Sequence, residues 1–183
     1  MATLEEIKAL LGEPRFLWSD PEPWHLLEQE LGVTFPTDFR AITDAYGPVL
    51  ISDKLYLDHP GHPTRNLGRS IKEEIEYWLE DEEKEILPGK AGTRPGELLP
   101  IATGATAEYI FLRVPPGPSA PWAVGIQELH SFEFELYAMT FSDWLLAFLK
   151  GKDVMVGASP PDRLFYESLD WGARARKGTN HTE

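Results

Sequence analysis

The sequence contains no cysteine among its 183 residues. This absence excludes disulfide bonds, thiolate nucleophiles and zinc sites built on cysteine. The chain also has no uninterrupted apolar run of ~18 residues, the length that a membrane-spanning helix needs. Its start, MATLEEIKALLG, lacks the basic residues and the long apolar stretch of a signal peptide, so we expect a cytoplasmic protein.

Basic residues are scarce beside acidic ones. Lys and Arg number 17 against 30 Asp and Glu, which gives a formal charge of −13. Nucleic-acid phosphates would be repelled by most of such a surface, so direct binding to nucleic acid is not expected. The acidic excess has two explanations, the solubility of an ordinary protein or selection for a basic partner.

The most strongly patterned stretch is LGVTFPTDFRAITDAYG, residues 31–47. Pro36 suits the first turn of a helix, Gly47 suits the left-handed conformation that ends one, and Pro48 prevents continuation. The apolar residues between these points recur at helical spacing and predict one buried face: Phe35, Phe39, Ile42 and Tyr46.

Further helices follow from cap residues and apolar periodicity. Thr3 with Glu6 forms a capping box before a first helix, and Thr140 with Asp143 opens a late one. The predicted ranges are 4–11, 24–31, 70–87 and 140–150, with a last short helix after Ser159. From Gly172 the chain is polar and without pattern, so residues 172–183 are expected to be a disordered tail.

Alternating runs predict the strands. Val49–Ile51 and Lys54–Leu57 suit a small hairpin. Four longer runs with short, turn-rich connectors predict an antiparallel meander over residues 98–103, 108–114, 122–127 and 132–139. In the last run apolar residues alternate with acids, so we expect helices to cover its apolar face. The expected fold is α+β, with a mostly antiparallel sheet of about six strands packed against several helices in one domain, residues 1–171.

These segments resemble the SUKH superfamily. LGVTFPTDFRAITDAYG is similar to its signature helix, ISDKLYL to the short strands that follow, LLPIATGATAEYIFL to its paired strands and TFSDWLLAFLKG to its closing helix. The four motifs occur in the family's order between about Trp24 and Gly151. The resemblance implies a binding protein without a cofactor. Bacterial members are largely immunity proteins that neutralise a toxin, frequently a nuclease or deaminase, and fungal members regulate cell-wall synthesis through protein contacts.

Candidate catalytic and metal-binding residues are few. His59 and His62 in HPGHP lack the spacing of a helical metal pair, and loop histidines beside proline are usually exposed. We expect His25 to be partly buried and His130 to lie in a turn. Glu133 and Glu135 share a strand face, as any half-exposed strand would place them. No nucleophile elbow, phosphate-binding loop or dinucleotide fingerprint is present, so we expect no enzyme activity, no metal and no cofactor.

The predicted helix over 70–87 carries the clearest binding hypothesis. Four of its glutamates, Glu73, Glu76, Glu80 and Glu83, fall on one face opposite the apolar stripe. This face is either solvated or directed at a basic protein partner. The second candidate surface comprises Tyr46, Tyr56 and Asp58. We expect a monomeric immunity-type module; the alternatives are an endogenous scaffold or regulator of the same fold and an enzyme with a scattered site.

Overall fold

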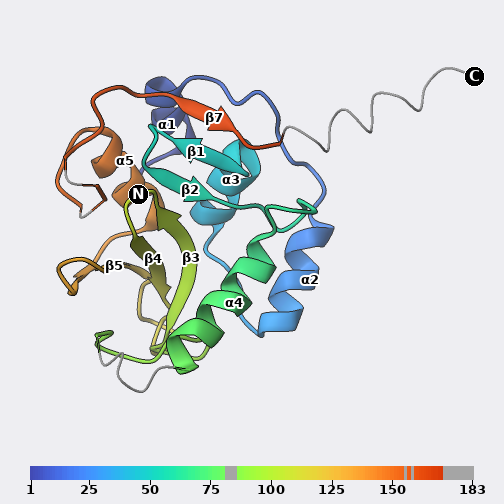
Figure 1. The fold of residues 1–183 in the computed structure, drawn as a ribbon. Helices are drawn as coiled ribbons and strands as arrows, with labels where there is room; N and C mark the ends of the chain where they lie inside the picture. The colour runs from blue at the N-terminus through green and yellow to red at the C-terminus, as the bar shows by residue number, and fades with distance from the viewer. Residues whose placement is uncertain (81–85, 155, 158, 171–183) are drawn as a thin grey trace, which may run out of the picture.

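The computed structural model describes residues 1–80, 86–154, 156–157 and 159–170. Within them the chain forms an α+β fold of five helices and one seven-stranded sheet, which confirms the predicted fold class (Figure 1). The strand order is β6-β5-β4-β3-β2-β1-β7, and every neighbouring pair is antiparallel. No helix in these ranges is long and apolar enough to cross a membrane. The elements are α1 Leu4–Leu11, α2 Glu22–Leu31, α3 Thr37–Tyr46, β1 Val49–Ile51, β2 Leu55–Leu57, α4 Leu67–Glu80, β3 Leu98–Gly104, β4 Glu108–Arg113, β5 Ala123–Glu128, β6 Glu133–Tyr137, α5 Phe141–Leu149 and β7 Tyr166–Ser168.

The helix caps predicted from the sequence are present. At α1 the Thr3 amide donates to Glu6 Oε2 at 2.8 Å, and the Glu6 amide donates to Thr3 Oγ1 at 3.3 Å. At α5 the Asp143 amide donates to Thr140 Oγ1 at 3.2 Å. These contacts satisfy amide groups that have no partner inside the helix, so short local motifs were enough to locate both helix starts.

Gly47 ends α3 as expected, but for a different reason. Its φ of −71° is not left-handed. A Cβ at this position would lie 2.9 Å from the Thr43 carbonyl oxygen and 3.2 Å from that of Asp58. Glycine is therefore required by the close approach of two backbone segments, which the sequence alone did not reveal.

The main core lies on one face of the sheet. Helices α1, α3 and α5 contact one another there, and α5 also contacts β5. Trp144 and Phe148 of α5 belong to the same buried cluster as residues from β4 and β5: Ile110, Leu112, Val124 and Ile126. The late helix predicted over residues 140–150 therefore packs on the central strands of the sheet.

The opposite face of the sheet carries a second buried cluster, formed by Trp78, Ala91, Leu98 and Phe111. Phe134 of β6 packs against this second cluster, whereas Tyr137 packs against the main core. The apolar face of β6 therefore points away from the helices of the main core and toward Trp78 of α4, so a helix covers it as expected, although that helix is α4 and not α5. Alternation cannot distinguish the two faces when both are partly covered, here by α4 and the chain near Ala91.

The segment after Ser159 was predicted to be helical, and this prediction was wrong. Residues 166–168 form β7, which pairs with β1 at the edge of the sheet. Ser52 and Leu169 donate their amides to Phe165 and Pro48 at 2.9 Å each, and extend the ladder at both ends. A three-residue strand is formed here because the edge of β1 offers unpaired backbone groups.

Helix α4 begins three residues earlier than predicted, at Leu67. Asn66 Oδ1 accepts from the Arg69 amide at 3.0 Å, as an N-cap residue does. Gly68 is buried against Leu27 of α2, where a Cβ would approach Leu27 Cδ1 to 2.8 Å. The NLG sequence that resembles a turn is therefore the first turn of the helix. Residues 81–85, near the end of the predicted 70–87 helix, lie outside the described residues. The predicted tail, residues 172–183, lies wholly outside them.

Candidate functional site

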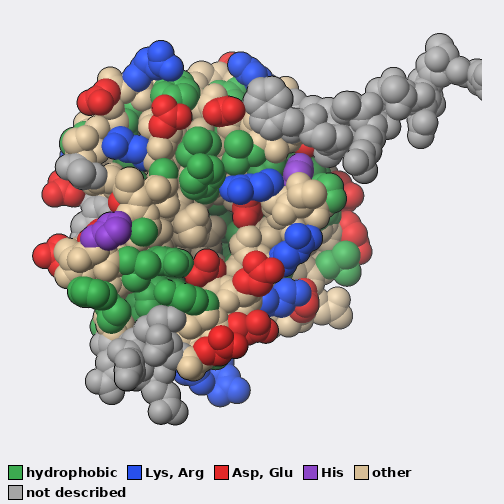
Figure 2. Space-filling model, viewed as in Figure 1, with side chains coloured by type: hydrophobic (Ala, Val, Ile, Leu, Met, Phe, Trp, Pro, Cys, Tyr) green, Lys and Arg blue, Asp and Glu red, His purple; other side chains and the backbone are tan. Residues whose placement is uncertain are grey.

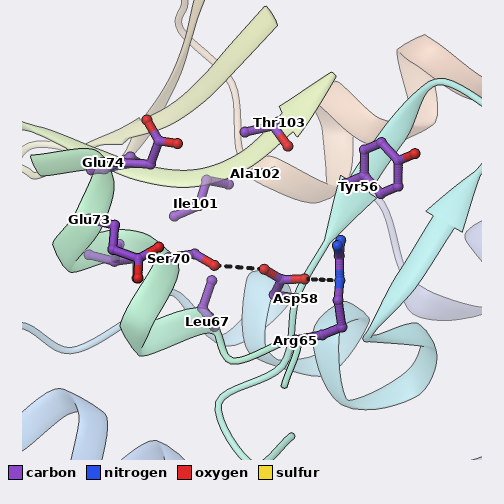
Figure 3. Close-up of a pocket in the computed structure, with 12 residues that line it drawn as sticks. Tyr56, Asp58, Arg65, Leu67, Ser70, Glu73, Glu74, Ile101, Ala102 and Thr103 are labelled. Carbon is purple, nitrogen blue, oxygen red and sulfur yellow. Dashed lines mark hydrogen bonds and ion pairs between the residues drawn. The ribbon is translucent and has the colours of Figure 1, made fainter. Parts of the chain in front are cut away.

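The sheet separates between β2 and β3, and a pocket forms at the separation. The two strands pair only at Leu55–Gly104 and Tyr56–Thr103. Beyond Tyr56 the chain leaves β3, and α4 packs beside β3. The hollow between them measures about 220 Å³. Its lining comprises Tyr56, Asp58, Arg65, Leu67, Ser70, Ile71, Glu73, Glu74 and residues 100–103 (Figure 3).

Asp58 organises the polar part of this pocket. Its Oδ1 forms an ion pair with Arg65 Nε at 2.9 Å, and its Oδ2 accepts from Ser70 Oγ at 2.7 Å. The guanidinium of Arg65 also lies 5.2 Å from the centre of the Tyr56 ring, within cation–π range. Asp58 thus offsets the charge of Arg65, and Glu73 of α4 adds a further carboxylate to the pocket lining.

The structure brings three of the predicted site residues together. Tyr56, Asp58 and Glu73 line one pocket although they come from β2, the following loop and α4. Glu76 and Glu80 are exposed further along α4. Figure 2 shows acidic side chains along this helix, in the lower half of the view. Glu83, the fourth predicted glutamate, lies outside the described residues.

Tyr46 does not belong to an accessible surface. It is only 4% exposed, its hydroxyl donates to the Gly12 carbonyl at 2.7 Å, and its ring packs on Tyr166. Burial raises the pKa of its phenol above the ordinary value. This geometry contradicts the prediction that Tyr46 contacts a partner. The apolar periodicity of α3 already indicated that Tyr46 lies on the buried face of that helix.

His59 was expected to be exposed and is fully buried. Its Nδ1 accepts from the Gly61 amide at 2.9 Å, so the Nε2 nitrogen carries the proton and donates to Asp44 Oδ1 at 2.9 Å. Trp18 stacks on the imidazole at 3.9 Å between ring centres. Burial lowers the pKa of His59, while its bond to Asp44 opposes that shift.

His62 has the same arrangement with different partners. Its Nδ1 accepts from the Arg65 amide at 2.9 Å, and its Nε2 pairs with Asp170 Oδ1 at 3.1 Å. Both nitrogens of each histidine are therefore engaged in holding the loop, and neither is free to act as a base or a metal ligand. Among the described residues no group of three or more His, Asp or Glu side chains is placed to hold a metal ion. Of the other histidines, His25 is exposed rather than partly buried, and His130 lies in a turn as predicted.

A larger hollow of about 530 Å³ lies near the ends of β4 and β5. Its one buried carboxylate, Glu108, accepts from Thr106 Oγ1 at 2.6 Å and from the Gly157 amide at 2.8 Å. These bonds fix the turn before β4 to the chain near Gly157. Glu108 is thus a structural acceptor, and we assign no chemistry to this hollow.

Three residues of the pocket were not among the predicted site residues: Arg65, Ser70 and Glu74. Ser70, Glu73 and Glu74 follow the i, i+3, i+4 spacing of one helix face, so a signal was present for part of the pocket. Arg65 lies in a segment rich in turn-forming residues, which predicts an ordinary loop. Its position depends on the His62 turn, which is a tertiary feature.

No protein-family model, curated protein or solved structure matches this chain. The resemblance to the SUKH superfamily therefore stays a prediction that rests on the four sequence motifs.

Proposed function

We propose that this protein is a non-catalytic binding module that recognises a basic protein partner. The observation that carries the proposal is the pocket between β3 and α4, which adjoins the exposed glutamates of α4. Glu73 lines the pocket, while Glu76 and Glu80 extend the same negative surface along the helix. Complementary charge on a partner would raise the encounter rate and fix its orientation.

The size of the pocket favours a binding role over turnover of a metabolite. Pockets for small-molecule ligands usually measure ~300–1,000 Å³, and this one measures about 220 Å³. Its only hydroxyl nucleophile on α4, Ser70, donates to a carboxylate that Arg65 already engages. No histidine among the lining residues is placed to take a proton from Ser70. The pocket is better suited to hold one side chain of a larger partner.

Within this class, the proposed role is that of a cytoplasmic immunity protein that binds and neutralises a nuclease or deaminase type of toxin domain. Support comes from the order of the four SUKH-like motifs and from the formal charge of −13, since such a toxin would present a basic surface to nucleic acid. A monomer with no cofactor suffices for this role.

The test is affinity capture from a lysate of the native host supplemented with the product of the neighbouring gene. We expect a basic toxin domain to be retained and its activity to be inhibited at a stoichiometric ratio. Retention of an endogenous protein without toxin activity would replace this role by that of a scaffold or regulator. Turnover of a small substrate by the isolated protein would contradict the binding proposal itself.

A further inference from the structure

We infer that the pocket between β3 and α4 receives one arginine side chain of the partner. This inference rests on the proposed binding function and names the chemical group that the pocket recognises. Three features support a guanidinium: the volume of the pocket, the distribution of its charges, and the strand edge that forms one wall.

Charge is distributed unevenly across the pocket. Figure 3 shows Arg65 and Tyr56 at one end, and Glu73 and Glu74 at the α4 end, with Asp58 and Ser70 between them. Asp58 offsets Arg65 through their 2.9 Å ion pair. Glu73 adds a further carboxylate at the α4 end, so a cationic group is favoured there and an anion is disfavoured.

The wall opposite α4 supplies acceptors of another kind. At Pro100–Ala102, β3 pairs with β4 across a bulge, and within the described residues it has no strand partner on the β2 side. Pro100 contributes a carbonyl but no N–H to this stretch, so at this residue the backbone can accept a hydrogen bond but not donate one. An arriving donor would find carboxylates on one wall and a strand edge on the other.

Arginine fits this combination better than lysine. Its planar guanidinium carries five N–H donors in a fixed fork, which can reach a carboxylate and a carbonyl together, whereas an ammonium is a compact and strongly hydrated charge. Arg65 illustrates the match, because its own guanidinium is held here by one carboxylate and the Tyr56 ring. A volume of about 220 Å³ leaves room for a single side chain.

The test uses the purified protein and a small probe, N-acetyl-argininamide, titrated into the ¹⁵N-labelled chain and followed by amide chemical shifts. We expect saturable shifts at Ser70, Ala102 and Thr103, and binding at least three-fold weaker for N-acetyl-lysinamide. Absence of saturable shifts would overturn the inference. So would preferential binding of N-acetyl-glutamate amide, since that would make Arg65 the centre of an anion site.

Two matched variants on α4 distinguish an effect of the pocket on probe binding from a general effect of negative charge. Glu73→Gln should weaken the arginine probe at least five-fold, because Glu73 lines the pocket. Glu76→Gln removes the same charge from an exposed position outside the pocket lining and should leave binding within two-fold. Equal weakening by the two variants would show only a diffuse electrostatic effect and would contradict a specific site.

The same variants distinguish this inference from the proposed function. If the probe does not bind, but charge reversal on α4 slows association with the captured partner, the arginine site is wrong and the binding module stands. If the probe binds as described, but neither Glu73→Gln nor charge reversal affects the partner, the pocket is a guanidinium site and the proposed mode of partner binding is wrong.

Discussion

Both imidazoles of the HPGHP segment bind neighbouring groups through both of their nitrogens. At His59 the neutral form is needed for this, since Nδ1 must accept the Gly61 amide while Nε2 donates to Asp44. Protonation of Nδ1 would break one of these bonds inside a fully buried site. The segment that positions Asp58 and Arg65 is therefore sensitive to acid at His59.

The free energy of unfolding should decrease as the pH is lowered, because His59 is buried in its neutral form. Burial lowers the pKa of folded His59 below the ordinary value of 6.5, so above pH 6.5 the imidazole is neutral in both states and its contribution to stability is complete. As the pH falls below 6.5, the unfolded chain takes up a proton that the folded chain refuses, and stability is lost. Urea unfolding at pH 7.5 and 5.5 measures this loss.

Two substitutions isolate the effect of His59 from that of other titrating groups. His59→Gln should destabilise the protein at pH 7.5 but show a shallower loss of unfolding free energy toward pH 5.5 than the wild type. His25→Gln, at a side chain that is 61% exposed, should follow the wild-type profile. Identical pH profiles for wild type and His59→Gln would contradict the assignment of acid sensitivity to this imidazole.

Trp144 is among the largest fully buried side chains of the main core. Its side chain is fully buried and lies between Phe141 and Phe148, at 5.8 and 6.3 Å between ring centres. Trp144→Ala should cost about 3–5 kcal/mol through cavity formation. Phe132→Ala, at a ring that is 64% exposed, should change stability by less than about 0.5 kcal/mol. Equal melting temperatures for Trp144→Ala and wild type would contradict the core described here.

At the scale of elements, β7 provides the clearest test of the sheet. Two backbone hydrogen bonds flank β7: the Ser52 amide donates to the Phe165 carbonyl, and the Leu169 amide donates to the Pro48 carbonyl. They show which residue pairs of the antiparallel ladder are hydrogen-bonded. By that alternation Glu167, opposite Leu50, exchanges backbone bonds with β1, whereas the Ser168 amide points away from β1.

Proline substitution should therefore distinguish neighbouring residues of β7. Glu167→Pro removes a ladder donor and should lower the free energy of unfolding by ~1–3 kcal/mol, while Ser168→Pro removes an outward amide and should have a smaller effect. Thermal unfolding of both variants measures the difference. A larger loss for Ser168→Pro would place the ladder in the other register.

Elements with local signals were predicted well, and elements that need distant partners were not. The Thr3 and Thr140 caps and the alternation of β3 to β5 act over a few residues, so the sequence displays them directly. β7 forms only because β1 offers an edge more than 100 residues away along the chain. The sequence did not show which helix covers the apolar face of β6, because Phe134 packs against the Trp78 cluster, whose position depends on α4.

At the scale of the whole molecule, the candidate site also combines features with a local sequence signal and features that depend on distant residues. The glutamate face of α4 follows from helical periodicity alone, and Glu73, Glu76 and Glu80 are exposed as predicted. The pocket itself requires the separation of β2 from β3 and the turn that His62 holds through Asp170, 108 residues away. No local pattern specifies those contacts. Tyr46 was misassigned for a related reason, since the buried Gly12 carbonyl that binds its hydroxyl is 34 residues away.

The chain has a formal charge of −13. We expect this charge to act mainly on the rate at which a partner associates. Charges at the rim of an interface mainly steer the encounter, and screening at ~0.15 M salt shortens their reach to about 8 Å. Partner binding through α4 should therefore be fast at low salt and slower as salt is added. The stability of the protein itself should change little when exposed glutamates of α4 are replaced.

The association rate constant of the captured partner, measured by stopped flow with wild type and with the Glu73→Lys, Glu76→Lys, Glu80→Lys triple variant, tests the account most directly. At low ionic strength the triple variant should associate at least about ten-fold more slowly and lose most of the salt dependence. Its melting temperature should match that of the wild type. Wild-type association rates for the triple variant at low salt would contradict the assignment of α4 and its pocket as the binding surface.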